Sequence, residues 1–144
     1  MLKTFRRLVP LPIIALTLIP CVEGVKAEEE LIDGQCQPNP PVNVAANCRS
    51  ATFIDPAAVE VYNESRRFWL RTDYYGRSSD QNRIVRSMLY ETVVCTERKI
   101  ATTKVVSYTR GGASQSKTQP LEFILPKQQT RTQRSAIRFV CELN

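Results

Sequence analysis

The chain contains no histidine, and this absence narrows its chemistry more than any other feature of its composition. Catalytic dyads and triads that use histidine as the base are excluded, and so are zinc sites with histidine ligands. A switch that depends on histidine protonation is excluded for the same reason. The cysteines show no CxxC spacing that would supply a thiolate metal site instead. We therefore expect no metal, no cofactor and no enzymatic activity.

The chain also has no apolar run long enough to span a bilayer, which needs about 20 residues. Its longest apolar stretch covers 8–19, follows a basic segment with Lys3, Arg6 and Arg7, and precedes Val25-Lys26-Ala27. This order is typical of a signal peptide. We expect cleavage after Ala27, export, and no transmembrane segment. Lipidation of Cys21 is the alternative, although Pro20 directly before that cysteine fits a lipoprotein site poorly.

Basic residues are missing from the start of the mature chain. Cleavage after Ala27 leaves residues 28–144, a length that suits one domain. Residues 28–48 contain four acidic residues and no Lys or Arg, so every mature basic residue lies between Arg49 and Arg138. This basic part favours acidic glycans, anionic lipid headgroups or acidic protein surfaces as partners. Export argues against nucleic acid.

Four cysteines remain after removal of the signal peptide, namely Cys36, Cys48, Cys95 and Cys141. In an exported chain this number usually means two disulfides, with three ways of pairing them. We favour Cys36–Cys48 and Cys95–Cys141, because the first pair would close the Pro- and Asn-rich stretch 37–47. A catalytic thiol would need a base that the chain does not supply.

Hydrophobic periodicity predicts a run of short strands followed by one helix. Residues 28–49 are interpreted as an acidic, irregular extension with its own disulfide, and residues 50–144 as the main domain. Asn63-Glu64-Ser65, residues 96–98 and Gly111-Gly112 are predicted turns. Strands are predicted at 51–55, 59–62, 67–74, 84–95, 100–108 and 121–125.

Residues 130–143 change to a helical period. Ala136, Ile137 and Val140 share one side with Cys141 at its edge, and Arg131, Arg134 and Arg138 fall on the opposite side. The fold predicted is α+β, an antiparallel meander of about five or six strands with a C-terminal helix packed on it.

The order of several residues also resembles a known family. They are Phe53-Ile54-Asp55, Val59, Phe68-Trp69, Asp73-Tyr74, Arg86-Ser87, Cys95, Tyr108 and Val140-Cys141. Over 51–141 the chain resembles the surface-adhesin protein E family of Gram-negative bacteria. The resemblance implies an antiparallel sheet joined to the helix by a Cys95–Cys141 disulfide, and a location in the periplasm or on the outer membrane. It also implies a non-enzymatic protein that binds host matrix and plasma proteins. The alternative is a periplasmic accessory or inhibitor protein that binds an envelope protein.

Three groups of residues are candidate binding surfaces. Arg67 and Arg71 flank Trp69 on one strand face, where guanidinium–indole stacking is an option. A sheet face covered by a helix or by a second copy explains an apolar Trp equally well. Tyr74 and Tyr75 precede the polar loop 76–82, our preferred contact region.

The third group is Arg131, Arg134 and Arg138, for which a solvated helix face is the stronger interpretation. Edge strands of the sheet favour pairing into a homodimer. Asp55 and Asp73 are candidates for a hydrolytic carboxylate pair. However, Asp55-Pro56 is explained better as the start of a turn.

Overall fold

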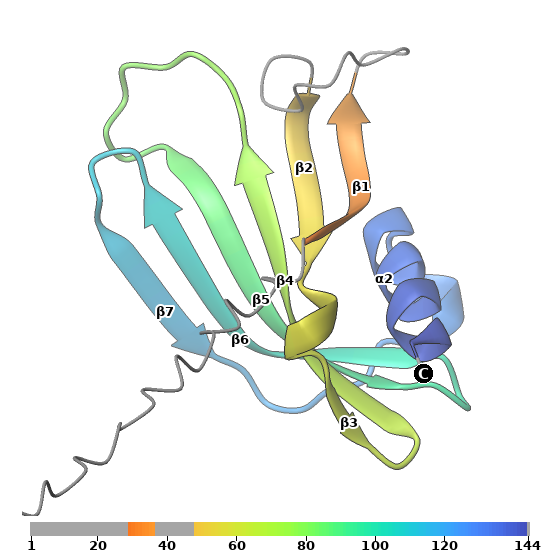
Figure 1. Ribbon diagram of the computed structural model, residues 1–144. Helices are drawn as coiled ribbons and strands as arrows, with labels where there is room; N and C mark the ends of the chain where they lie inside the picture. Colours follow the sequence, from red (N-terminus) through yellow and green to blue (C-terminus); the bar gives the residue numbers. More distant parts are fainter. Residues whose placement is uncertain (1–28, 37–47, 144) are drawn as a thin grey trace, which may run out of the picture.

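The computed structural model describes residues 29–36 and 48–143, which form a seven-stranded antiparallel sheet and one α-helix (Figure 1). The signal peptide, Cys21 and the 37–47 loop lie outside the described residues. Neighbouring strands follow the order β1-β2-β4-β5-β6-β7, and β3 pairs with β4. The bounds are β1 Glu30–Cys36, β2 Cys48–Ile54, β3 Glu60–Tyr62, β4 Ser65–Tyr74, β5 Ile84–Val94, β6 Lys99–Thr109, β7 Ser114–Thr118 and α2 Arg131–Glu142, with 3-10 turns at Pro56–Ala58 and Pro126–Gln128. The predicted α+β class is confirmed.

The long strands follow the alternation that the sequence predicts. In β4, Phe68 and Leu70 are buried on one side of the sheet, and Trp69 between them is half-exposed on the other. Asn63 has a φ of 51° in the turn that joins β3 to β4, a left-handed conformation that Asn tolerates. The predicted turn at 63–65 is confirmed.

The helix packs on the side of the sheet that carries Phe68 and Leu70. Its first turn is closed by a capping box, in which Thr130 and Gln133 each accept a backbone N–H of the other. Figure 1 shows α2 beside β1, away from β7. The core that joins helix and sheet consists of Ile54, Phe68, Leu70, Val93, Ile100, Ala136, Ile137 and Val140. The apolar side of the predicted helix is therefore confirmed.

Three expectations about the ends of the sheet are corrected. Residues 30–36, expected to be irregular, form edge strand β1, whose two register shifts hide the usual alternation. A further strand, β7, was not predicted because its sequence SQSKT has no apolar residue to mark a buried face. Residues 121–125 do not form a strand, since only Ile124 bridges to Ile100 while Leu121 and Leu125 stay exposed.

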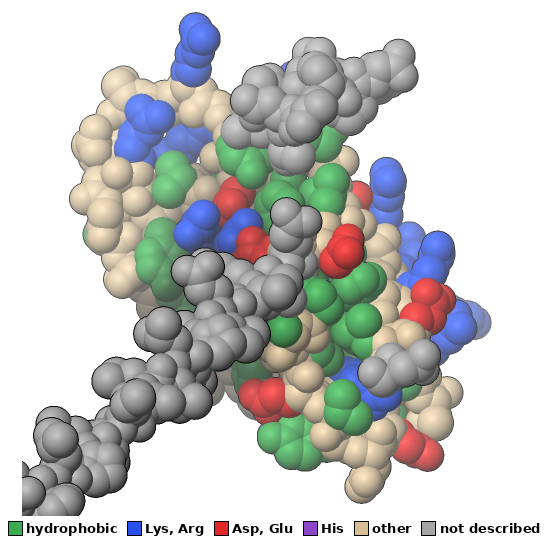
Figure 2. Space-filling view, in the orientation of Figure 1, with side chains coloured by type: hydrophobic (Ala, Val, Ile, Leu, Met, Phe, Trp, Pro, Cys, Tyr) green, Lys and Arg blue, Asp and Glu red, His purple; other side chains and the backbone are tan. Residues whose placement is uncertain are grey.

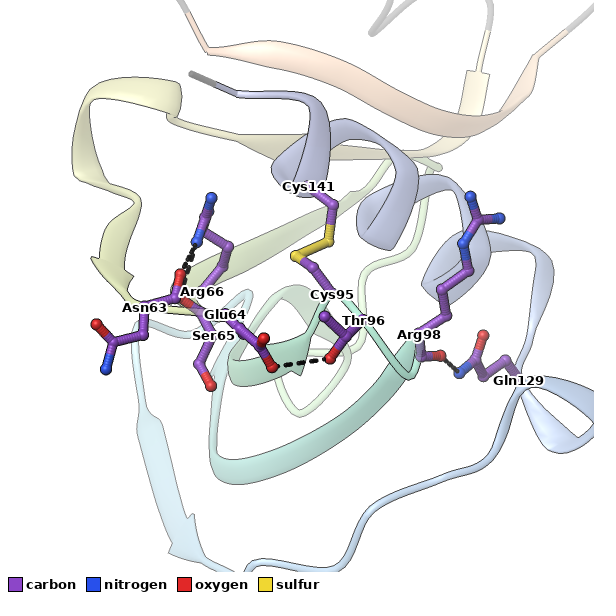
Figure 3. Close-up of a disulfide and its surroundings, with 9 residues drawn as sticks. All are labelled: Asn63, Glu64, Ser65, Arg66, Cys95, Thr96, Arg98, Gln129 and Cys141. Carbon is purple, nitrogen blue, oxygen red and sulfur yellow. Dashed lines mark hydrogen bonds between the residues drawn. A yellow bond between two sulfur atoms is a disulfide. The ribbon is translucent and has the colours of Figure 1, made fainter.

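Both favoured disulfides are present, Cys36–Cys48 and Cys95–Cys141. The second lies beside the β5–β6 turn, which is held from two other directions (Figure 3). The Cys95 N–H donates to the Glu64 carbonyl at 2.9 Å, and the Gln129 side-chain amide donates to the Arg98 carbonyl at 2.6 Å. The turn is thus fixed to the β3–β4 hairpin, to the end of α2 and to the segment before α2.

Removal of the Cys95–Cys141 disulfide should cost more stability than removal of the other. The two bridges close loops with sequence separations of 46 and 12 residues. Chain entropy then gives about 4 kcal/mol for the first and about 3 kcal/mol for the second. We expect this order for the Cys95→Ala/Cys141→Ala and Cys36→Ala/Cys48→Ala variants in urea denaturation. A larger loss for the second pair would contradict the view that the helix bridge is the main covalent constraint.

Candidate functional site

Aromatic rings and cations alternate on the sheet face opposite α2. We call this surface the open face, because no described element packs on it; it comprises Phe53, Tyr62, Arg67, Trp69, Arg71, Tyr90 and Lys104. The ring centroids of Trp69 and Tyr90 are 5.0 Å apart on neighbouring strands. Lys104 lies on the next strand, β6, and its Nζ is 6.0 Å from the Trp69 ring centroid. Side chains of three adjacent strands thus form one connected surface.

Arg67 and Arg71, for which stacking on Trp69 was an option, lie over other rings. Arg67 instead lies over the Tyr62 ring and Arg71 over the Phe53 ring, each with its Cζ 4.8 Å from the ring centroid. Residues two apart on a strand project in parallel, so a side chain meets its cross-strand neighbour more readily. The sequence placed Arg67, Trp69 and Arg71 on one face and missed Phe53, Tyr62, Tyr90 and Lys104, which pairing with other strands brings beside them.

Carboxylates neutralise one part of the open face and leave another part cationic. Asp73 Oδ1 accepts from Arg86 Nε at 2.6 Å, and this hydrogen bond raises the pKa of Arg86. Arg71 is ion-paired with Glu29 and lies beside Asp73. Among the described residues, neither Arg67 nor Lys104 has a carboxylate within ion-pair distance. Neither cation is therefore held in an ion pair, and Glu60 lies directly opposite Arg67 in the β3–β4 register.

Glu60 fixes two of the aromatic residues at the lower end of this face. Its carboxylate accepts from the Tyr62 hydroxyl at 3.0 Å and from the Tyr90 hydroxyl at 3.3 Å. Burial, followed by the nearby Glu60 charge, raises the pKa of Tyr90. Tyr90 therefore keeps its proton and serves as a hydrogen-bond donor.

The two aspartates considered for hydrolysis do not come together. In the β2–β4 register Asp73 lies opposite Ala51, and Ala51 is four residues before Asp55 in the chain. At the usual strand rise this separation is about 13 Å. Asp55 Oδ1 instead accepts the Ala57 N–H at 2.9 Å and begins the 3-10 turn, as the alternative interpretation predicts.

The helix arginines belong to a surface separate from the open face, since α2 packs on the other side of the sheet. Arg131 Nε lies 3.6 Å from Asp33 Oδ1, and Arg134 donates to the Gln129 carbonyl. Arg138 is exposed. Two of these three side chains thus have partners within the protein, and their role in binding stays a prediction.

Tyr74 and Tyr75 lie in a third place, at the end of β4. The Tyr74 hydroxyl is 3.3 Å from Ser87 Oγ, and the Tyr75 N–H donates to the Arg49 carbonyl at 2.8 Å. Both tyrosines line a cavity of about 460 Å³ together with Arg49, Arg77 and Arg83. We call this cavity the end pocket. Sequence reasoning missed Arg83, at the end of this loop, and Arg49, which the pairing of β2 with β4 brings to it.

A buried carboxyl group was also missed. Glu91 is fully buried on the α2 side of β5, opposite Phe68, and both its oxygens lie 3.0 Å from Thr102 Oγ1. Burial raises the pKa of Glu91, and the Thr102 hydroxyl opposes this shift in part. The alternation of Leu89, Glu91 and Val93 along the strand was the signal that could have revealed it.

The family model described as surface-adhesin protein E matches residues 42–142, more than half of the chain. The chain belongs to this family. It is therefore an adhesin-like surface protein, as the resemblance in the sequence indicates. No curated protein and no solved structure matches the chain. Within the described residues, α2 falls short of the length and apolar character that crossing a membrane requires.

The buried Glu91 should make stability depend on pH. Because the pKa of Glu91 is raised in the folded state, the folded protein holds this proton more tightly than the unfolded chain. Its contribution to stability is complete below the ordinary glutamate pKa and is lost as pH rises through the raised value. We expect the free energy of unfolding to decline over this range, and Glu91→Gln to lack that part of the decline.

Urea denaturation at a series of pH values measures this difference. Glu122→Gln, which alters an exposed glutamate, is the matched control and should follow the wild-type profile. Parallel profiles for wild type and Glu91→Gln would contradict the prediction.

Proposed function

We propose that the protein is an exported, non-enzymatic adhesin whose open face binds host matrix proteins or acidic glycans. The observation that carries the proposal is the connected group of aromatic rings and unpaired cations on the face opposite α2. Trp, Tyr and Arg are the residue types that dominate binding energy at protein interfaces. Half-exposed rings held by neighbouring strands lose little conformational freedom when a partner covers them.

The proposed place of action is the outer-membrane surface of a Gram-negative bacterium. The signal-peptide pattern at residues 1–27 supports export. Family membership supports display at the surface, where host proteins are accessible. Protease treatment of intact cells separates this location from the periplasm, because only a displayed protein is cleaved.

The two edges of the sheet differ in a way that supports a homodimer through β7. At the β1 edge, two register shifts interrupt the strand, and α2 lies beside it. These features discourage edge pairing. By contrast, β7 pairs with β6 without a register shift and is exposed along its whole length. An antiparallel β7–β7 pair centred on Ser116 places Gln115 opposite Lys117, so no like charges face each other directly.

Truncation of the central ring of the open face should weaken adhesion. We expect Trp69→Ala to reduce binding to laminin, vitronectin, plasminogen or heparin at least about tenfold, since a hot-spot aromatic contributes about 2 kcal/mol or more. Solid-phase binding at two salt concentrations measures this. Leu125→Ala, which shortens an exposed apolar side chain on another surface, is the control. Equal binding by wild type and Trp69→Ala would remove the open face as the adhesive surface.

Proline at the centre of β7 should block the proposed dimer without breaking the sheet. The Thr109 N–H donates to the Ala113 carbonyl, and the Gln119 N–H donates to the Thr103 carbonyl. In the register that these bonds define, Ser116 and Val106 form a pair without hydrogen bonds to each other, so the Ser116 N–H points away from β6. Ser116→Pro therefore removes an outward donor and keeps the bonds to β6. We expect Ser116→Pro to be monomeric by light scattering and Ser116→Ala to be dimeric. A wild type that is monomeric at high concentration would contradict the dimer.

A further inference from the structure

The end pocket gathers three guanidinium groups around one cavity. Arg49 comes from β2, and Arg77 and Arg83 come from the loop between β4 and β5. Figure 2 shows Lys and Arg side chains gathered over this loop. The cavity of about 460 Å³ is widely open to solvent, so it can admit one group of a larger ligand. The remaining lining groups are neutral and include the side chains of Ser50, Tyr74 and Tyr75.

The Arg83 guanidinium packs against the backbone of a glycine in the loop. Gly76 has a φ of 152°, a conformation that L-residues rarely adopt. A side chain there would also place its Cβ 2.6 Å from Arg83 Nη2. The guanidinium therefore packs directly on the glycine, in space that any other residue would occupy.

The loop itself is fixed by hydrogen bonds at both ends. The Asn82 N–H donates to Asp80 Oδ1 at 2.9 Å, and the Arg110 N–H donates to the Arg83 carbonyl at 2.9 Å. Gly111 packs closely on Gln81, whose carbonyl accepts the Gly111 N–H. The Tyr75 N–H bond to the Arg49 carbonyl joins the loop to β2 on the other side. Preorganisation of this kind lowers the entropy lost on binding.

The three arginines carry like charges, and no carboxylate among the described residues lies within ion-pair distance of them. Arg49, Arg77 and Arg83 form no ion pair with the described acidic side chains, and no acidic residue lines the cavity. Asp73, whose charge reaches Tyr75, is occupied by Arg86 and Arg71. The planar guanidinium of arginine binds phosphate and other oxyanions through two parallel hydrogen bonds, which lysine cannot form.

We propose that the end pocket binds a tetrahedral oxyanion, the sulfate or phosphate group of a larger ligand, through Arg49, Arg77 and Arg83. Tyr74 and Tyr75 supply hydroxyl groups and ring surface at its wall. The inference goes beyond the proposed function, because it assigns an acidic group to a second site that shares no residue with the open face. The site itself is defined by the oxyanion, so it is tested first with inorganic sulfate alone.

The experiment compares thermal unfolding in sodium sulfate and in sodium chloride at equal ionic strength, with phosphate as a second probe. Sulfate stabilises proteins in general, so the informative quantity is the difference between variants. We expect a larger rise in Tm for wild type than for Arg49→Gln/Arg77→Gln/Arg83→Gln. Arg83→Lys, which keeps the charge and loses the planar fork, should show an intermediate rise. Arg110→Gln, which removes a nearby charge outside the cavity lining, should match wild type.

Two results would overturn the site. One is an equal sulfate effect in wild type and the triple variant, which indicates general stabilisation only. The other is a loss in Arg110→Gln as large as that in the triple variant, which indicates diffuse electrostatics. Circular dichroism in chloride confirms that each variant is folded. If the triple variant does not fold, the single variants Arg49→Gln and Arg77→Gln replace it in the comparison.

The source of the oxyanion is then assigned with larger probes. A heparin oligosaccharide and its desulfated form test a glycan, and vesicles with and without a phosphate-monoester lipid test a headgroup. Arg83-dependent binding of either charged probe supports the site. Sulfate binding without binding of heparin at the pocket retains the site and removes a sulfated glycan as its ligand, while adhesion through the open face is tested separately by Trp69→Ala. The two failures are therefore distinguishable.

Discussion

The burial of one side of α2 against one face of the sheet is the constraint on which the rest of the structure depends. Ala136, Ile137 and Val140 fill the surface formed by Phe68, Leu70 and their neighbours, and the Cys95–Cys141 bridge fixes the end of the helix. A sheet of this size needs one covered face to be stable in water. Once α2 covers that face, the alternation of each strand sends the remaining side chains to the other.

The covering of one sheet face by α2 explains which residues form the open face. Trp69 projects away from the helix because its neighbours Phe68 and Leu70 project toward it. Its ring gains a partner from β5, and the antiparallel register brings Tyr90 directly opposite. A surface of large rings on the exposed side of a sheet is costly in water unless something covers it for part of the time. This cost of exposing aromatic rings to water favours a binding role for the open face.

The sequence predicted the parts of the fold in which one residue pattern determines the outcome. The alternation in 67–74 and the helical period of 130–143 each depend on apolar residues meeting one core, and the cysteine pairing agrees with both. The residue pattern did not predict features that depend on contacts between separate strands. Two bulges disguise β1, β7 has no buried face, and the partners of Arg67 and Arg71 lie on other strands. The end pocket was half predicted, because Tyr74, Tyr75 and their loop are local and Arg49 is not.

The distribution of ion pairs decides where the basic surplus of the chain can act. Asp73, Glu29 and Asp33 form ion pairs with Arg71, Arg86 and Arg131, whereas most other described Lys and Arg side chains form none. Two groups of these cations without an ion pair lie on the surfaces considered for binding. The open face has two such cations beside rings, whereas the end pocket has three and no ring–cation pair among the described contacts. Added salt screens exposed charges far more than it weakens apolar contact. The two surfaces should thus differ in salt dependence, and binding that weakens steeply with salt would arise at the end pocket.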